Sequence, residues 1–133
     1  MTGAGNLTEE KALRAYAAMV NTGATHAFEA LLADDFVYES QRVFAALTSK
    51  QEFIEYIRPK LRAVERSGRT AFAEMGVLNP DGRRQPCVVL AQDHADNLIA
   101  LIMAKVSEDK IKRIDLCIVP PPDSAQRSGE YPE

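Results

Sequence analysis

The sequence has few of the residues that build metal centres or disulfide frameworks. Its 133 residues include two cysteines, two histidines and no tryptophan. Metal sites use close pairs of cysteine or histidine ligands, whereas Cys87 and Cys117 lie far apart inside strand-like segments. We therefore expect no metal site, no cofactor and two free, buried thiols.

Charge and hydropathy exclude further classes. The net charge of -3 leaves no basic surface to hold the phosphates of a nucleic acid. The longest apolar run, residues 98–104, is far too short to span a bilayer. The N-terminal MTGAGNLTEE has neither the basic region nor the apolar stretch of a signal peptide. We expect a cytoplasmic protein that binds neither nucleic acid nor membranes.

Length and composition predict one globular domain. A hydrophobic content of 46% and a charged content of 26% are ordinary for a soluble domain of this size. The C-terminal PPPDSAQRSGEYPE is rich in proline and polar residues and has almost nothing to bury. We expect a disordered N-terminus over residues 1–6, a single domain over 7–119 and a disordered tail over 120–133.

The first half of the chain carries helix signals. Thr8 can cap a first helix that ends at Gly23, and Thr25 can cap a short second one. Ser49 opens a capping box for a third helix, whose apolar residues recur at helical spacing. Pro59 should kink or split that helix, because proline removes a backbone hydrogen bond.

From Thr70 onward the apolar pattern changes to a period of two, which indicates strands. Polar turn residues separate consecutive runs, so the strands should pair antiparallel as a meander. Helices followed by strands give an α+β fold. An earlier strand opens at Asp34-Asp35, and the later ones cover residues 70–78, 86–93, 98–106 and 111–119.

The first 40 residues carry a family resemblance. Tyr16 in a first helix, Gly23 at its end, and Ala33-Asp34-Asp35 before a strand resemble the start of the nuclear transport factor 2-like superfamily. That superfamily includes ketosteroid isomerase and the SnoaL-like polyketide cyclases. The resemblance implies a conical fold, with N-terminal helices packed on a curved, mainly antiparallel sheet. It also implies a pocket on the concave side of the sheet and a homodimer interface on the convex side.

The resemblance implies a changed catalytic site. Such isomerases use a tyrosine and a protonated aspartic acid to stabilise an enolate, and a second aspartate to move the proton. Tyr16 keeps the tyrosine position, whereas Ser40 and Ile102 fall at or near the other two. Neither serine without a base nor isoleucine can do that chemistry. We therefore do not expect an authentic ketosteroid isomerase.

Two carboxylates remain as candidate bases. Glu39 neighbours Ser40 and should point to the opposite face of the strand, so it reaches the pocket only if the strand slips by one residue. Asp93 would pair with Ala100 at the pocket mouth if the turn at residues 96–97 has two residues, and would face the other way with three. Tyr16, Asp93 and Glu39 are the candidate catalytic residues.

Three functions remain open. The leading hypothesis is a homodimer that binds a small apolar or weakly polar molecule in the conical pocket. The alternatives are a cofactor-free isomerase, cyclase or dehydratase acting on a steroid- or polyketide-like substrate, and a protein-interaction platform with a filled core. We expect the dimer face around Ile99, Leu101 and Met103. The expected pocket residues are Tyr16, Phe36, Tyr38, Ser40, Phe53, Ile57, Ile102, Ile114, Leu116 and Ile118.

The sequence also predicts the environment of Glu74. Glu74 lies in the strand-like run from Thr70, between Ala73 and Met75. Charged residues in an edge strand usually face water. We therefore expect the Glu74 carboxylate to be solvated.

Overall fold

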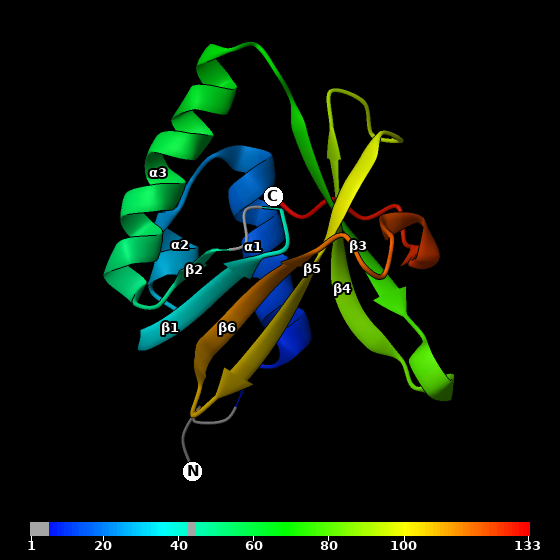
Figure 1. The fold of residues 1–133 in the computed structure, drawn as a ribbon, viewed down its shortest axis with the longest axis horizontal. Coiled ribbons are helices and arrows are strands. Elements are labelled where there is room, and N and C mark those ends of the chain that lie inside the picture. The colour runs from blue at the N-terminus through cyan, green and yellow to red at the C-terminus, as the bar shows by residue number, and fades with distance from the viewer. Residues whose placement is uncertain (1–5, 43–44) are drawn as a thin grey trace.

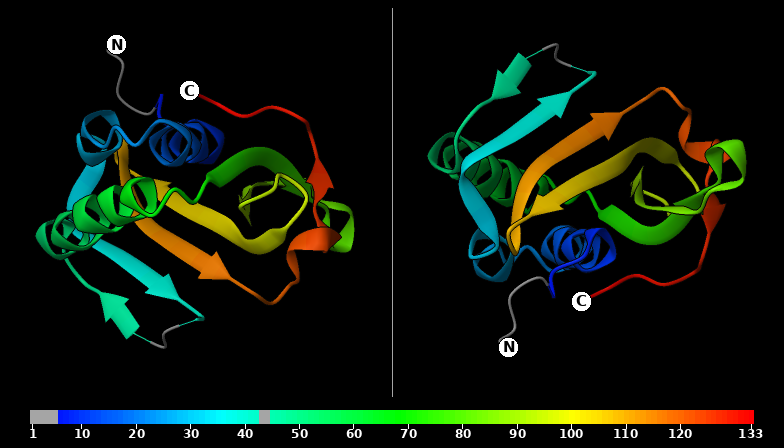
Figure 2. Two further views of the ribbon diagram at one scale, coloured as in Figure 1. Left: turned by 90° about the horizontal axis from the view of Figure 1, so that it is seen from above. Right: turned by 90° about the horizontal axis from the view of Figure 1, so that it is seen from below.

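A computed structural model describes residues 6–42 and 45–133 of the chain. Its centre is one seven-stranded sheet with the order β2-β1-β6-β5-β4-β3-β7. The helices cover one face of this sheet, which we call the helix face; the opposite side is the far face (Figures 1 and 2). None of the helices within the described ranges is long and apolar enough to cross a membrane.

The elements follow the predicted order, with short additions. The helices are α1 (Glu9–Thr22), α2 (His26–Glu29), α3 (Lys50–Arg66) and the 3-10 turns η1 (Pro80–Gly82) and η2 (Pro122–Ser124). The strands are β1 (Leu32–Ser40), β2 (Ala45–Leu47), β3 (Ala71–Leu78), β4 (Gln85–Gln92), β5 (Leu98–Ser107), β6 (Lys110–Cys117) and β7 (Gln126–Arg127).

The caps predicted at Thr8 and Ser49 are confirmed, whereas Thr25 precedes α2 without a side-chain capping bond. The hydroxyl of Thr8 accepts a hydrogen bond from the Lys11 amide at 3.1 Å, and Gly23 ends α1 with a φ of 81°. Ser49 caps α3 by accepting a bond from the Glu52 amide at 3.1 Å. The predicted split at Pro59 is wrong, because α3 continues through that residue to Arg66.

The predicted meander is also confirmed. Strands β3, β4, β5 and β6 pair antiparallel in sequence order. Strand β1 joins the open edge of β6 in parallel, with Tyr38 opposite Ile114, and β2 pairs antiparallel with β1. The sheet is therefore mixed, and the α+β architecture predicted from the sequence is correct.

The C-terminal segment is ordered, contrary to the prediction of a disordered tail over residues 120–133. It passes along the far face at η2, pairs with β3 through β7, and continues round the sheet edge to α1 (Figure 2). The expected disordered N-terminus falls on residues 1–5, which lie outside the described residues, and on Asn6. The prediction for the C-terminal segment failed because polar contacts hold that segment, and its low apolar content does not indicate them.

Glu74 is buried rather than solvated, so that prediction is wrong as well. Only 4% of its side chain is exposed. Its two carboxylate oxygens accept bonds from Arg127 Nε and from the Gly129 amide, each at 2.7 Å. The C-terminal segment thus covers the strand that would otherwise have been the edge of the sheet.

A second ion pair connects α3 with α2. Arg58 of α3 donates to both oxygens of Glu29, at 2.8 Å and 2.6 Å, and Glu29 is 7% exposed. The Arg58 guanidinium holds the pKa of the Glu29 carboxyl below its usual value, against the opposing effect of burial. The pair fastens α3 to α2, which directly precedes β1.

Deleting residues 123–133 should destabilise the domain. The deletion removes the backbone bonds from the segment to β3 and leaves a buried Glu74 carboxylate without its partners. We expect the midpoint of thermal unfolding to fall by about 5–10 °C, on the scale of roughly 2 kcal/mol. Adding Glu74→Gln to the truncated chain should recover part of the loss. An unchanged midpoint in the truncated chain would show that the segment contributes nothing.

Replacing Glu29 by Gln should lower stability at neutral pH and matter less in acid. A carboxyl whose folded pKa is depressed stabilises the fold above its unfolded pKa, and this contribution is lost as the pH falls through the folded value. The difference in unfolding midpoint between wild type and Glu29→Gln should therefore shrink from pH 7 to pH 3. Scanning calorimetry across this range checks it, and a constant difference would refute it.

Candidate functional site

The predicted pocket residues lie on the helix face, but they pack against one another. Eight of them belong to one hydrophobic core, with exposures of 0–7%, and Ser40 beside them is 7% exposed. The eight are Tyr16, Phe36, Tyr38, Phe53, Ile57, Ile102, Ile114 and Leu116. Nine of the ten predicted residues are therefore buried, although Ser40 and Leu116 also line the larger hollow described below.

Phe53 occupies the middle of this interior. Its ring centroid lies 5.1 Å from that of Phe36, 5.4 Å from Tyr38 and 6.0 Å from Phe28, in tilted or edge-on contacts. Such distances are those of packed aromatic pairs. The side chains expected to line the conical pocket fill it instead.

The tyrosine hydroxyls of this interior are held in the neutral form. Burial, followed by the neighbouring Tyr38 and Tyr56, raises the pKa of Tyr16 well above its usual value. Burial and then Tyr56 likewise raise the pKa of Tyr38. Both phenols can donate a hydrogen bond at neutral pH, but neither can act as a base.

The expected bases are not placed beside Tyr16. Asp93 lies in the β4–β5 turn with a φ of 71°, is exposed, and forms an ion pair with Arg69 at 3.0 Å. That pair lowers the pKa of the Asp93 carboxyl. The predicted pairing with Ala100 is wrong, because a bulge shifts the register and Leu90 takes that position.

Glu39 points to the far face, as alternation with Tyr38 and Ser40 predicts. Half of its side chain is exposed, and it forms an ion pair with Arg113 of β6. The one-residue slip that would have turned it inward does not occur.

Ile118 is not a pocket residue, so that prediction is also wrong. Strand β6 ends at Cys117, which takes Ile118 out of the alternation of Ile114 and Leu116. Its side chain is 42% exposed, and the next residue, Val119, is 74% exposed.

The two best-formed hollows in the described part of the chain are not lined by Tyr16, Phe53 or Ile102. The smaller one, of about 280 Å³, lies between the C-terminal ends of α1 and α3. The larger one, of about 680 Å³, opens at the far face over β1, β6 and β5. We call it the far-face groove. Its lining residues are Glu39, Ser40, Gln41, Ala46, Gln85, Met103, Lys105, Arg113, Asp115, Leu116 and Cys117.

Arg113 is the electrostatic centre of the far-face groove. Its guanidinium lies between two carboxylates, those of Glu39 and Asp115, with 3.0 Å between Arg113 Nη2 and Asp115 Oδ1. The Arg113 and Asp115 side chains are 33% and 26% exposed, so the pair is partly withdrawn from water.

The register of the sheet arranges these charges in two adjacent rows. Glu39 lies opposite Asp115, which forms an acidic row across β1 and β6. Arg113 lies opposite Lys105, which forms a basic row across β6 and β5. Within residues 6–42 and 45–133, Lys105 makes no ion pair.

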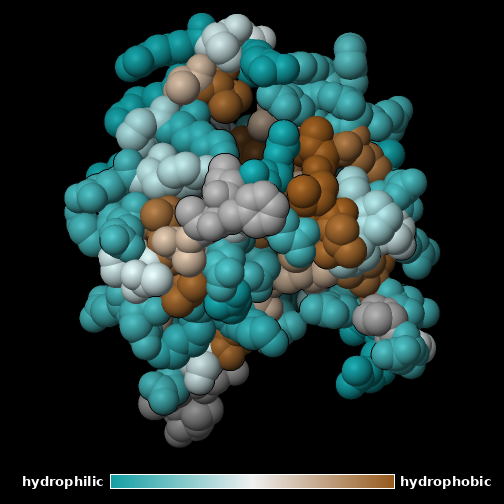
Figure 3. Space-filling model, viewed as in Figure 1, coloured by the Kyte–Doolittle hydropathy of each residue, from teal (hydrophilic) through white to brown (hydrophobic). Residues whose placement is uncertain are grey.

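Apolar residues border the groove. Gln41, which lines it, accepts hydrogen bonds from the amides of Ile118 and Val119 at 2.6 Å and 2.9 Å, so these exposed side chains adjoin it. Figure 3 shows the molecule from the direction of Figure 1, and on that side apolar residues (brown) lie next to hydrophilic ones (teal). The site thus combines opposite charges with exposed apolar surface.

Of the three expected dimer residues, Leu101 is completely covered by the chain itself. Leu101 is 0% exposed and belongs to a second cluster with Leu78, Val89 and Ala125 of the C-terminal segment. Ile99 packs against the helix-face core instead. Only Met103 of the three residues lines the groove.

Both thiols are free, as expected, and burial raises the pKa of Cys87 to about 11. Cys87 is buried, whereas Cys117 is only half-buried and lines the groove. No group of three or more potential metal-ligating side chains was found among the residues that the structure describes.

Sequence reasoning missed the groove. The alternation of Arg113, Asp115 and Cys117 opposite an apolar face indicated a mixed surface, which was the available signal. The ends of β4 and β5 supply Gln85 and Lys105, and only the sheet register brings those residues to the same place.

No protein-family model matches the chain, and no curated protein matches it significantly. Solved structures do. An NTF2-like protein of unknown function from Cytophaga hutchinsonii superposes with a TM-score of 0.59 at 9% identity, over 84% of this chain and 89% of that one. A candidate polyketide cyclase from Pseudomonas putida gives 0.56 at 20% identity, over 84% and 91%.

A candidate ketosteroid isomerase from Kribbella flavida gives a TM-score of 0.55 at 16% identity, over 98% of this chain and 84% of that one. Identities this low establish architecture and leave activity open. At the level of the fold, these structural matches confirm the family resemblance of the first 40 residues. The chain has the nuclear transport factor 2-like fold.

Proposed function

We propose that this protein is a binding module that associates with a second copy of itself through the far-face groove. The observation that carries the proposal is the contrast between the two sides of the sheet. The helix face is filled by Phe53 and its aromatic neighbours, whereas the far face keeps a groove of about 680 Å³ lined by charged residues. Of the three functions open at the sequence level, the interaction platform is best supported.

The charge pattern supports a second copy as the partner. In a two-fold symmetric contact each surface meets its own image, so a surface must be complementary to itself. A two-fold axis that passes between the two rows brings the acidic row of one copy, Glu39 and Asp115, against the basic row of the other copy, Arg113 and Lys105. Lys105, which lacks an ion pair among the described residues, then gains a carboxylate.

Exposed apolar side chains supply the non-polar part of this interface. Val119 and Ile118 are the large apolar residues most exposed among those the structure describes. They adjoin the groove, where Met103 and Cys117 are partly exposed. Burying such surface between two copies favours association.

An acid–base enzyme is the alternative, because candidate polyketide cyclases and isomerases share the fold. It requires a base near the Tyr16 hydroxyl. The neighbours that raise the pKa of Tyr16 are Tyr38 and Tyr56, while Glu39 and Asp93 are paired with arginines elsewhere. A small-molecule site on the helix face would also need space that the aromatic rings now occupy.

The replacement Lys105→Glu should weaken self-association. It turns half of the basic row acidic, so carboxylates of the two copies would face each other. Sedimentation equilibrium should show a wild-type dimer at micromolar concentration and a dissociation constant raised about tenfold or more in the variant. Lys11→Glu is the matched control, because Lys11 is exposed on α1, on the other side of the sheet.

A mixture provides the decisive comparison for this interface. Glu39→Lys should also weaken association, whereas an equimolar mixture of the Glu39→Lys and Lys105→Glu chains restores opposite charges across the contact. We expect the mixture to dimerise more strongly than either variant alone. A monomeric wild type, or a mixture no stronger than its components, rules the groove out as the interface.

A further inference from the structure

The outer edge of β3 holds an extended peptide, which is the chain's own C-terminal segment. Gly76 and Val77 pair antiparallel with β7. Next to them, Met75 donates its amide to the Glu130 carbonyl at 2.8 Å and accepts from the Ser128 amide at 3.1 Å. This is addition of a strand to a sheet edge, a recurring way for proteins to bind peptides.

A buried carboxylate recognises an arginine of the segment. Glu74 accepts from Arg127 Nε and from the Gly129 amide, each at 2.7 Å. The same guanidinium donates to Asp96 at 2.9 Å and to the Ala95 carbonyl at 3.0 Å. Among the described residues, both hydrogen-bond donors to the Glu74 carboxylate belong to the C-terminal segment. The domain therefore offers a buried acidic site whose complement is a single arginine side chain.

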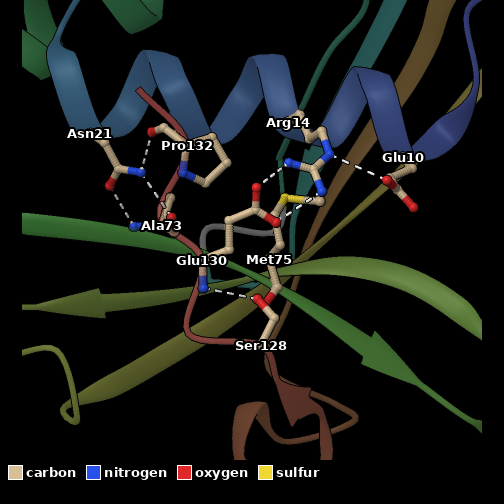
Figure 4. A network of polar contacts seen from close by, with 8 residues as sticks. All are labelled: Glu10, Arg14, Asn21, Ala73, Met75, Ser128, Glu130 and Pro132. Carbon is tan, nitrogen blue, oxygen red and sulfur yellow. Dashed lines mark hydrogen bonds and ion pairs between the residues drawn. The ribbon is translucent and has the colours of Figure 1, made fainter.

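A second anchor lies on α1. Arg14 donates to both carboxylate oxygens of Glu130, at 2.5 Å and 2.9 Å, and its guanidinium lowers the pKa of that carboxyl. Asn21, about two helical turns further along the same face of α1, donates to the Pro132 carbonyl at 2.7 Å (Figure 4). Opposite charges at fixed spacing thus select a peptide of the pattern Arg-x-x-Glu, and Asn21 adds a bond to its main chain.

The segment is attached like a ligand rather than like a core element. From position 120 to 133, Ala125 is the one buried residue. The residues that connect it to β6, Ile118 to Pro121, are exposed. Its remaining contacts are an edge-on packing of the Tyr131 ring on Phe72, main-chain pairing and polar anchors, all of which a second molecule can supply equally well.

We propose that the β3 edge, with Glu74, Asp96, Arg14 and Asn21, is a receptor for an extended Arg-x-x-Glu peptide, and that its ligand in trans is the C-terminal segment of a second copy. The second copy is the occupant because its segment carries the sequence that already satisfies every anchor. Reciprocal exchange of segments between two copies loses no contact within either receptor. The exchange needs no contact across the far-face groove.

Peptide binding tests the receptor. A labelled peptide of residues 122–133 should bind the full-length Arg127→Ala chain, whose own segment competes poorly, at least about tenfold more tightly than it binds wild type. The same peptide with Arg127→Ala should bind that chain at least about tenfold more weakly. Fluorescence anisotropy gives both affinities. No binding to the Arg127→Ala chain, or equal binding of the two peptides, overturns the receptor.

A charge exchange tests the second copy as occupant. Arg14→Glu and Glu130→Arg each place like charges together within one chain, but a mixed pair restores both anchors between chains. One variant carries the donor label and the other carries the acceptor label, and their mixture should show more energy transfer than a mixture of donor- and acceptor-labelled wild-type chains. The wild-type mixture measures association by any other route. The doubly exchanged chain, which restores the anchor within itself, should match wild type. Transfer in the mixture no higher than in wild type overturns exchange between copies.

Discussion

The seating of Phe53 at the centre of the helix face is the constraint on which the rest of the structure depends. It projects from α3, which Ser49 starts and which the Arg58–Glu29 pair fastens to α2. Its ring lies within 6.4 Å, centroid to centroid, of four other aromatic rings. A close-packed interior of this kind tolerates no guest without displacing a side chain. A ligand could enter among these rings only if one of the aromatic side chains moved.

The far face of the sheet has a part that the chain itself covers and a part that stays open. Under η2 and Ala125, the apolar residues Leu78, Val89 and Leu101 are covered by the chain itself. Beyond that cover, the groove around Arg113 stays open and charged. The C-terminal segment thus decides which part of the sheet can meet a partner, and the same segment closes the edge of β3.

The sequence predicted what local physics controls. Caps such as Thr8 and Ser49 and the alternation along the later strands are signals within a few residues, and they gave the helices, the meander and the inward face. The family resemblance supplied the arrangement of these elements. Glu39 was placed on the correct face because alternation alone decides it.

The failures share a cause, which is that distant residues decide the outcome. A tail with little apolar surface is ordered because Glu74, Arg14 and Asn21 present matching groups, and no segment of the sequence shows that match. Asp93 left the expected position because of a single bulge between β4 and β5. The filling of the pocket likewise depends on how five aromatic rings pack, which periodicity does not reveal.

The central claim is that Phe53 and its aromatic neighbours leave no space for a ligand at the centre of the helix face. A crystal of the wild-type protein pressurised with xenon tests it most directly, because xenon enters apolar cavities that are otherwise empty. Phe53→Ala, which removes the central ring, is the matched positive control and should take up xenon at that position. The account predicts no xenon site among Tyr16, Phe36 and Phe53 in wild type. An occupied site there, or a co-purified molecule bound in that place, would contradict it.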